Sequence, residues 1–113
     1  MSSETGKLEK DEAHYLLAAV QLQFADANDY VVPGSVRKYM LKVGWDESDI
    51  KACVMGLDES ELHKSQAHDT RPGVWLDIYK TAYEGELLYV KFTEHEDGRK
   101  VILLSFCRDG DEH

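Results

Sequence analysis

The chain has 113 residues, with 13 Lys and Arg against 22 Asp and Glu, which gives a formal net charge of −9 at pH 7. This length suits a single domain with its own core. The acidic balance argues against a general affinity for nucleic acid or anionic membranes, because like charges repel at long range. The acidic residues are spread along the chain, so a local basic pocket remains compatible with the composition.

Neither a membrane segment nor a metal or disulfide site is expected. No apolar run approaches the roughly 20 residues that a membrane span needs, and the polar start lacks the features of a signal peptide. Cys53 and Cys107 are the only cysteines, without a CxxC motif or a histidine cluster at ligand spacing. A reduced cytoplasmic protein without a disulfide partner, cofactor or metal is the simplest interpretation.

Residues 1–10 are polar and lack an apolar period, which is typical of a mobile tail. From residue 11 apolar side chains recur every three or four positions, which predicts an amphipathic helix ending near residues 27 and 28. The members of this stripe are Ala13, Leu16, Leu17, Val20 and Phe24. We expect a single domain over residues 11–108, followed by an acidic tail at 109–113.

Two further helices are expected before residue 58. Residues 30–32 form an extended connector, and the Gly-Ser pair after Pro33 supplies a break and an N-cap for a helix over 36–43. Gly44 ends that helix, and Asp46 can cap a third one. Gly56 occupies the C-terminal position where helices favour a residue tolerant of positive φ. The inward face of the third helix would hold Ile50, Cys53, Val54 and Leu57.

The second half of the chain is typical of strands. Residues 58–63 fit two interpretations, a capping box or the start of an alternating strand, and spacing does not decide between them. Beyond a Pro-Gly turn, strands are expected over 74–79, 87–94 and 101–108, with an Asp-Gly hairpin signal between the last two. Helices followed by an antiparallel meander predict an α+β fold, with N-terminal helices packed on a small C-terminal antiparallel sheet.

The register of the last hairpin decides whether Arg108 reaches the face of Tyr89. A two-residue turn would place Phe106 opposite Tyr89 and bring Arg108 onto that face. A bulged or odd-length loop reverses the parity, so that Arg108 points away. In this second register Tyr89 would pair with Cys107, Val90 with Phe106, and Phe92 with Leu104. Burying the bulkier row is worth roughly 1.5–3 kcal/mol per side chain, so we predict this second register.

The densest set of candidate site residues lies between residues 56 and 79. Side chains of this kind suit proton transfer and the stabilisation of negative charge. Histidine suits proton transfer near neutral pH, whereas lysine suits charge stabilisation, or the base role when its pKa is lowered. The candidates in this stretch are His63, Lys64, Gln66 and His68. Lys91 shares a strand face with Tyr89, which makes it a candidate phosphate contact.

These residues also have structural interpretations. A lysine on a strand, such as Lys64, is usually a solvated charge. Tyr89 is equally consistent with a half-buried sheet tyrosine. His63 and His68 fit ordinary surface positions, and Trp75 fits the core better than an RNA-stacking role. The site assignment therefore depends on more than composition.

One pattern joins the candidate residues. It consists of Glu59–Ser65 (ESELHKS), Trp75-x-Asp77-x-Tyr79, Gly85, Leu88-Tyr89-Val90-Lys91 and Leu104-Ser105-Phe106. It resembles the MqsR family of bacterial toxins, which are small RNA-cleaving enzymes of the RelE-like class encoded beside an antitoxin. The similarity covers about residues 55–106. It implies a RelE-like fold, single-stranded mRNA as the substrate and a cognate antitoxin as the partner.

In that family a lysine, a glutamine, a tyrosine and a second lysine act together. The resemblance assigns the first lysine to Lys64 and the tyrosine to Tyr89. The glutamine position holds Leu76 in this chain, and the second lysine position holds Cys107. An aromatic residue beside the first lysine helps to hold RNA, and this position is His63, an RNA contact or a proton shuttle. The predicted catalytic residues are Lys64, Tyr89 and His63, and the predicted RNA contacts are Lys91, Arg108, Gln66 and His68.

The expected function is that of a ribonuclease toxin that cleaves single-stranded mRNA, inhibits growth and is neutralised by its antitoxin. The alternative is a catalytically decayed member that acts as an antitoxin-binding or regulatory module. The residues at the two departing positions and the acidic charge favour the alternative. The retained His-Lys-Ser and Leu-Tyr-Val-Lys segments favour the enzyme.

Overall fold

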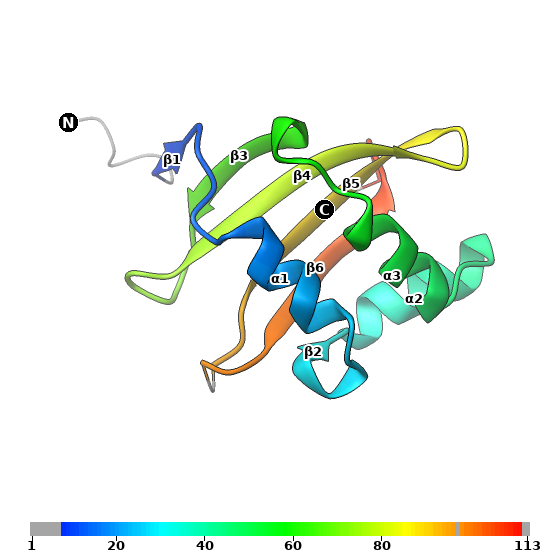
Figure 1. Ribbon diagram of the computed structural model, residues 1–113, viewed down its shortest axis with the longest axis horizontal. Coiled ribbons are helices and arrows are strands. Elements are labelled where there is room, and N and C mark those ends of the chain that lie inside the picture. Colours follow the sequence, from blue (N-terminus) through cyan, green and yellow to red (C-terminus); the bar gives the residue numbers. More distant parts are fainter. Residues whose placement is uncertain (1–7, 97, 112–113) are drawn as a thin grey trace.

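The computed structural model describes residues 8–96 and 98–111, and a six-stranded sheet forms its centre (Figure 1). The strand order is β1-β3-β4-β5-β6-β2, with β2 parallel to β6 and the other neighbours antiparallel. The strands are β1 Glu9–Lys10, β2 Tyr30–Val31, β3 Leu62–Ala67, β4 Trp75–Tyr83, β5 Glu86–Glu94 and β6 Val101–Arg108. The helices are α1 Leu17–Phe24, α2 Gly34–Val43, α3 Glu47–Met55, and the 3-10 turns η2 Ala27–Asp29 and η3 Glu59–Glu61.

This sheet corrects the predicted architecture. The prediction of N-terminal helices on a small C-terminal antiparallel sheet, RelE-like, is wrong because β1 and β2 come from the N-terminal half and β2 makes the sheet mixed. Tyr30 and Val31, predicted as a connector, pair with Val101 and Ile102. Strands of two residues carry no apolar period, so the sequence pattern does not reveal them. The coarse α+β class holds.

The predicted tails lie partly outside the described residues. This applies to residues 1–7 of the N-terminal tail and to residues 112–113 of the acidic tail. Glu9 and Lys10, which belonged to the predicted mobile tail, pair with Gln66 and Ser65 of β3. These two residues are therefore part of the sheet.

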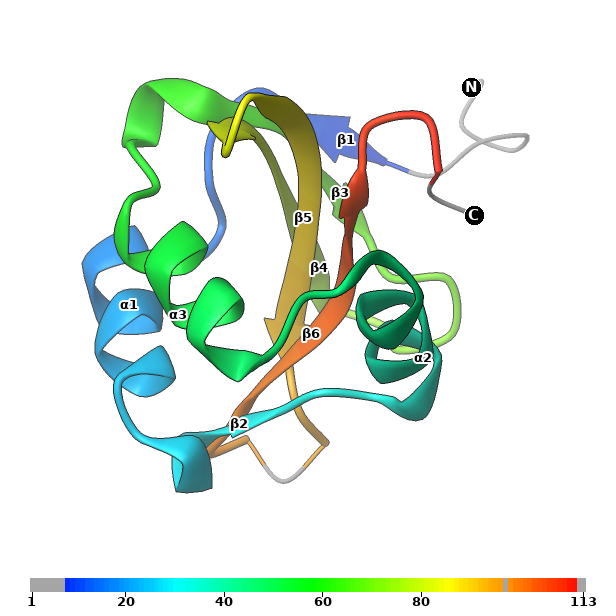
Figure 2. The same ribbon diagram turned by 90° about the vertical axis from the view of Figure 1, so that its right-hand side faces the viewer.

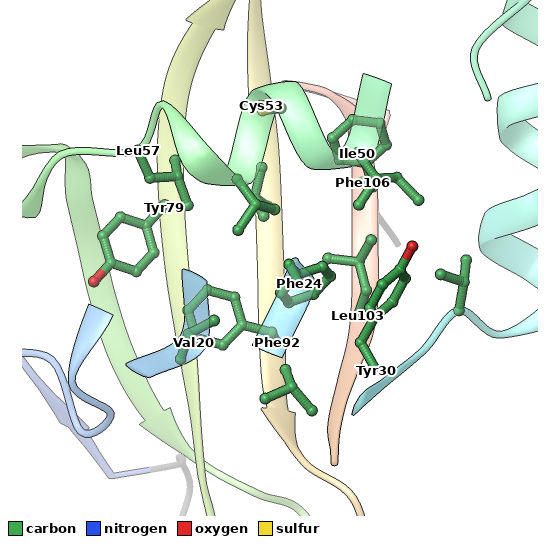
Figure 3. Packing of buried hydrophobic residues seen from close by; sticks show 14 of the residues in the cluster. Val20, Phe24, Tyr30, Ile50, Cys53, Leu57, Tyr79, Phe92, Leu103 and Phe106 are labelled. Atoms are coloured by element: carbon green, nitrogen blue, oxygen red, sulfur yellow. The ribbon is translucent and has the colours of Figure 1, made fainter. Parts of the chain in front are cut away.

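The helices divide between the two faces of the sheet. Figure 2 shows the sheet nearly edge-on, with α1 and α3 on one side and α2 on the other side, next to β6. The core lies between the sheet and the α1–α3 layer (Figure 3). Its largest fully buried side chains include Tyr79, Phe24, Phe92, Phe106, Ile50 and Leu103. Burial of each such side chain stabilises the fold by roughly 1.5–3 kcal/mol, so this layer holds the sheet against the helices.

The helix ends follow the sequence signals only in part. The predicted N-cap from the Gly-Ser pair is wrong, because α2 already begins at Gly34, and Pro33 occupies the N-cap without a side-chain hydrogen bond. Asp46 and Asp49 form a capping box that satisfies the first amides of α3. Gly44 ends α2 with φ of 86°, a conformation that glycine adopts without steric cost. Gly56, predicted to need positive φ, has φ of −89°. Its N–H donates to helical carbonyls of Ala52 and Cys53, so the helix continues into an ordinary turn rather than a left-handed cap.

Helix α1 is shorter than its apolar stripe predicted. Leu17, Val20 and Phe24 are buried as expected, but Ala13 is exposed and Leu16 retains 68% of its exposure. Residues 13–16 precede the helix because the carboxylate of Asp77 accepts hydrogen bonds from the amides of His14 and Tyr15 at 2.9–3.0 Å. This tertiary contact fixes the chain in a non-helical path before Leu17.

The segment at residues 58–63 satisfies both sequence interpretations. Asp58 and Glu61 form a capping box around η3, and β3 begins immediately afterwards at Leu62. The two signals therefore belong to two short consecutive elements.

The hairpin of β5 and β6 confirms the predicted register at its far end. Tyr89 lies opposite Cys107 and Val90 opposite Phe106. The predicted pairing of Phe92 with Leu104 is wrong, because Phe92 pairs with Leu103 and a β-bulge separates the two registers. The parity change thus comes from an extra residue inside β6, while the connecting loop spans residues 95–100. The pairs next to the loop, such as Glu94 with Val101, have the other parity.

Within the described residues, no helix is both long and apolar enough to cross a membrane. Cys53 and Cys107 are buried, and neither forms a disulfide within the part of the chain that the structure describes. Burial raises the pKa of the Cys53 thiol to about 12, with a smaller contribution from the nearby Glu61 charge. The described part of the chain holds no cluster of three or more His, Cys, Asp or Glu side chains suited to a metal ion.

Candidate functional site

The face of the sheet opposite α1 and α3 carries most of the predicted site residues. Cross-strand partners share a face, and two rows of partners run across the sheet there. One row consists of Lys64, Ile78, Lys91 and Ser105, and the next consists of Lys80, Tyr89 and Cys107. We call the three lysines and the tyrosine of these rows, Lys64, Lys80, Lys91 and Tyr89, the lysine face.

The alternation of β5 explains why these residues lie together. Leu88, Val90 and Phe92 are buried in the core, so Tyr89 and Lys91 point to the other side of the sheet. Both are half-buried, which places aliphatic and aromatic parts against the sheet and leaves their polar ends near solvent. The predicted shared face of Tyr89 and Lys91 is therefore confirmed.

Lys64 is bound by a carboxylate from the edge strand. Its Nζ lies 2.8 Å from Oε2 of Glu9, and the two side chains retain 30% and 48% of their exposure. The contact exists because β1 pairs with β3 beside Lys64. The edge strand therefore holds the Lys64 side chain in place through this ion pair.

Lys80 joins the candidate site, although the sequence interpretation did not select it. It lies directly opposite Tyr89 on β4, and its Nζ is 3.3 Å from Oδ1 of Asp109. The sequence could have indicated this position, since Leu76, Ile78 and Lys80 are two residues apart and share one face of the strand. The short strand predicted over 74–79 ended one residue too early to include it.

Gln66 lies on the same face, opposite the position at which the resemblance implies a glutamine. Gln66 is buried two residues after Lys64 and pairs with Leu76. Leu76 is the position at which the resemblance implies a glutamine, and Cys107, the position of the second lysine, pairs with Tyr89. All four family positions therefore lie on one face, and Gln66 provides an amide on the strand next to Leu76.

Two of the predicted RNA contacts have structural partners elsewhere. Nδ1 of His68 accepts hydrogen bonds from the amides of Thr70 and Arg71 at 3.1 and 3.2 Å, which stabilises the turn after β3. Arg108 pairs with Leu88 in the register, binds Glu86 and lies over the ring of Trp45, on the helix side of the sheet. The predicted orientation of Arg108 away from Tyr89 is confirmed, which separates it from the lysine face.

His63 lies at an irregularity of β3. The register of β3 with β4 shifts between Leu62 and Lys64, so His63 has no regular partner there. Its side chain is exposed. This bulge also changes the parity of β3, since Leu62 packs against the core while Lys64 lies on the opposite face.

Asp77 has a structural role that the sequence did not show. It is fully buried on the helix side of β4, and its carboxylate accepts hydrogen bonds from the amides of His14 and Tyr15. The hydroxyl of Tyr15 in turn donates to the carbonyl of Trp75 at 2.8 Å. The Trp-x-Asp motif thus anchors the segment before α1.

A comparison with known protein families identifies the class and the family of this chain. It defines the class first: the chain is a toxin of a toxin–antitoxin system, a class with an antitoxin as partner. The chain belongs to the family described as Motility quorum-sensing regulator, toxin of MqsA, whose model matches residues 12–108. The resemblance inferred from residues 55–106 is confirmed and extends through the N-terminal helices. A search of curated proteins gave no match.

The chemical capacity of the lysine face follows from its charges. Three ammonium groups and one phenol lie within two adjacent cross-strand rows of a chain whose net charge is −9. Such donors suit phosphate oxygens and the charge that develops on a phosphorane. Glu9 and Asp109 compensate two of these cations in the free protein.

Proposed function

We propose that the protein is a metal-independent endoribonuclease toxin that cleaves single-stranded mRNA and is neutralised by a cognate antitoxin. The observation that carries this proposal is the lysine face, because it gathers cations and a phenol on one sheet surface in a family of toxins. The cytoplasm, where mRNA is available, is the compartment in which this activity operates.

The proposed roles follow from the environment of each side chain. Lys64 and Lys91 lie in one row and stabilise the developing phosphorane charge, with Lys80 beside them. Tyr89 donates a hydrogen bond to a phosphate oxygen. His63, exposed next to Lys64, accepts the proton of the attacking 2′-hydroxyl. Gln66 orients the substrate from the strand beside Leu76.

The reaction needs no group beyond these. The 2′-oxygen attacks phosphorus as its proton passes to His63, and the bond to the 5′-oxygen breaks. The leaving oxygen takes a proton from one of the ammonium groups. The products are a 2′,3′-cyclic phosphate and a 5′-hydroxyl end.

Two experiments test the function. Induced expression of the wild-type protein should arrest growth and shorten messages, and Lys64→Ala should relieve both effects. Lys51→Ala on α3 removes the same charge away from the lysine face, so it should retain toxicity. Purified protein should cleave single-stranded RNA in the presence of a metal chelator. A harmless wild-type protein that leaves single-stranded RNA intact would exclude the enzyme.

A second candidate function is an antitoxin-binding or regulatory module without catalysis. Two observations favour it: Leu76 and Cys107 occupy family site positions, and carboxylates hold Lys64 and Lys80. This module should bind the antitoxin with unchanged affinity after Lys64→Ala, and the wild type should show no cleavage. Growth arrest by the wild type that depends on Lys64 would contradict it.

A further inference from the structure

A groove lies between α2 and β6, directly beside the lysine face. Its volume is about 520 Å³, within the range of about 300–1,000 Å³ typical of ligand sites. On the strand side it is lined by Ser105 and Cys107, which are the cross-strand partners of Lys91 and Tyr89. A chain bound across the lysine face therefore reaches this groove within one strand spacing.

The β-bulge in β6 gives the groove its apolar wall. Adjacent residues of a regular strand point to opposite faces, yet Leu104 and Ser105 both line the groove. They do so at the place where the register shifts between the pairs of Phe92 and Lys91. Bulges re-aim side chains in this manner. Leu104 thereby leaves the core row and joins the buried Val36 and Cys107 in forming an apolar floor.

The rim of the groove is cationic. Lys38 and Lys42 lie one turn apart on α2, are exposed and both line the groove. Asp111 also lines it, and its Oδ2 accepts a hydrogen bond from the hydroxyl of Tyr39 at 2.7 Å. Among the described residues no carboxylate lies within 4.0 Å of either lysine, in contrast to Lys64 and Lys80. Two cations thus face one carboxylate in a chain that is acidic overall.

We propose that this groove is a nucleotide subsite, which binds the residue of single-stranded RNA next to the one whose phosphate lies on the lysine face. The base enters the apolar space beside Leu104 and the ring of Tyr39, and Lys38 and Lys42 contact the flanking phosphates. Apolar and aromatic walls receive unstacked bases in RNA-binding proteins, while lysines at the rim bind the backbone. The proposal rests on the proposed ribonuclease function and adds the surface that holds the substrate.

The test measures binding rather than cleavage, so that catalysis does not enter. The probe is a fluorescent hexanucleotide of 2′-O-methyl RNA, which lacks the attacking hydroxyl, and fluorescence anisotropy is followed as a function of salt. The variant Lys38→Gln with Lys42→Gln loses two phosphate contacts. Its slope of log affinity against log salt should be shallower by about 1.4. For a fourfold rise in salt, the variant should therefore lose roughly sevenfold less affinity than the wild type. The charge-matched variant Lys51→Gln with Lys100→Gln should keep the wild-type slope.

A second measurement tests the base pocket. Hexanucleotides with one abasic position are compared, and the wild type should lose roughly fivefold or more at the position that enters the groove. Leu104→Trp fills the groove and should abolish this dependence, whereas Leu22→Trp, exposed on the opposite side of the sheet, should not. Circular dichroism verifies that each variant folds.

The outcomes separate the two proposals. Wild-type protein that binds RNA, with Lys38, Lys42 and Leu104 variants indistinguishable from their controls, overturns the subsite and leaves the ribonuclease proposal standing. Wild-type protein that binds no RNA at low salt overturns the ribonuclease proposal itself. A shallower salt slope together with loss of the abasic dependence supports the subsite.

Discussion

Removal of the carboxylate beside Lys64 should strengthen RNA binding. Glu9 holds the Lys64 ammonium at 2.8 Å, with both side chains partly exposed. Exposed ion pairs contribute about 0.2–1 kcal/mol, and an RNA phosphate must replace this interaction when it binds Lys64. Glu9→Gln removes the competitor, so affinity for single-stranded RNA should rise by about 1.4- to 5-fold. The gain should shrink as salt rises, because screening weakens contacts between exposed charges.

The assay is fluorescence anisotropy with non-cleavable 2′-O-methyl RNA, and two controls isolate the ion pair. Glu12→Gln removes one exposed carboxylate of the same segment, so it changes the net charge of −9 by the same unit without touching Lys64. It should have a smaller effect. In a Lys64→Gln background the gain from Glu9→Gln should vanish. If Glu9→Gln strengthens binding equally in that background, long-range repulsion explains the effect and the competition argument is refuted.

Three further predictions follow from the same structure. Asp77→Ala leaves the amides of His14 and Tyr15 without their charged acceptor, so it should lower the unfolding free energy, measured in urea, by about 3 kcal/mol or more. The control Asp11→Ala, at an exposed position, should change this free energy by less than about 0.5 kcal/mol. Equal effects of the two substitutions would show that Asp77 does not anchor the segment before α1. Burial, with the nearby Asp77 and Glu59 charges, raises the pKa of Tyr79 to about 12. The pKa of an unfolded tyrosine is about 10, so the contribution of Tyr79 to the unfolding free energy is complete below about pH 10. It is lost as pH rises toward 12, at about 1.4 kcal/mol per pH unit. In Tyr79→Phe the unfolding free energy, measured in urea, should therefore fall less steeply above pH 10, and an unchanged slope would contradict this. Finally, three phosphate contacts on the lysine face predict a salt slope of about −2, to which the groove lysines add about −1.4; affinity independent of salt would show that stacking rather than charge holds the RNA.

Strand parity separates Tyr89 and Lys91, on the lysine face, from Arg108, on the helix side of the sheet. Alternation along β5 was readable from the sequence, because Leu88, Val90 and Phe92 form an apolar row that excludes Tyr89 and Lys91 from the core. The same reasoning predicted that Arg108 points away from Tyr89. The error at Leu104 has a local cause, since a bulge inserts one residue and no composition signal marks its place.

The sequence by itself determined the features that depend on neighbouring residues. The caps at Asp46 and Asp58, the end of α2 at Gly44 and the hairpin strands follow from local backbone preferences and alternation. The family pattern identified the class of toxin and made Lys64 and Tyr89 candidates, because that pattern lies within a continuous stretch of chain. These features need no information about distant contacts.

Only the tertiary structure decided which charges meet. Glu9 lies 55 positions before Lys64, and Asp109 follows Lys80 only after two further strands, so no spacing rule joins either pair. The two-residue strands β1 and β2 exist because an edge of the sheet accepts their amides and carbonyls, not because of their own propensity. The groove likewise arises where α2, placed by burial of Val36 and Met40, lies beside a bulged strand. Local sequence fixes elements and their faces, whereas long-range packing determines which side chains share a site.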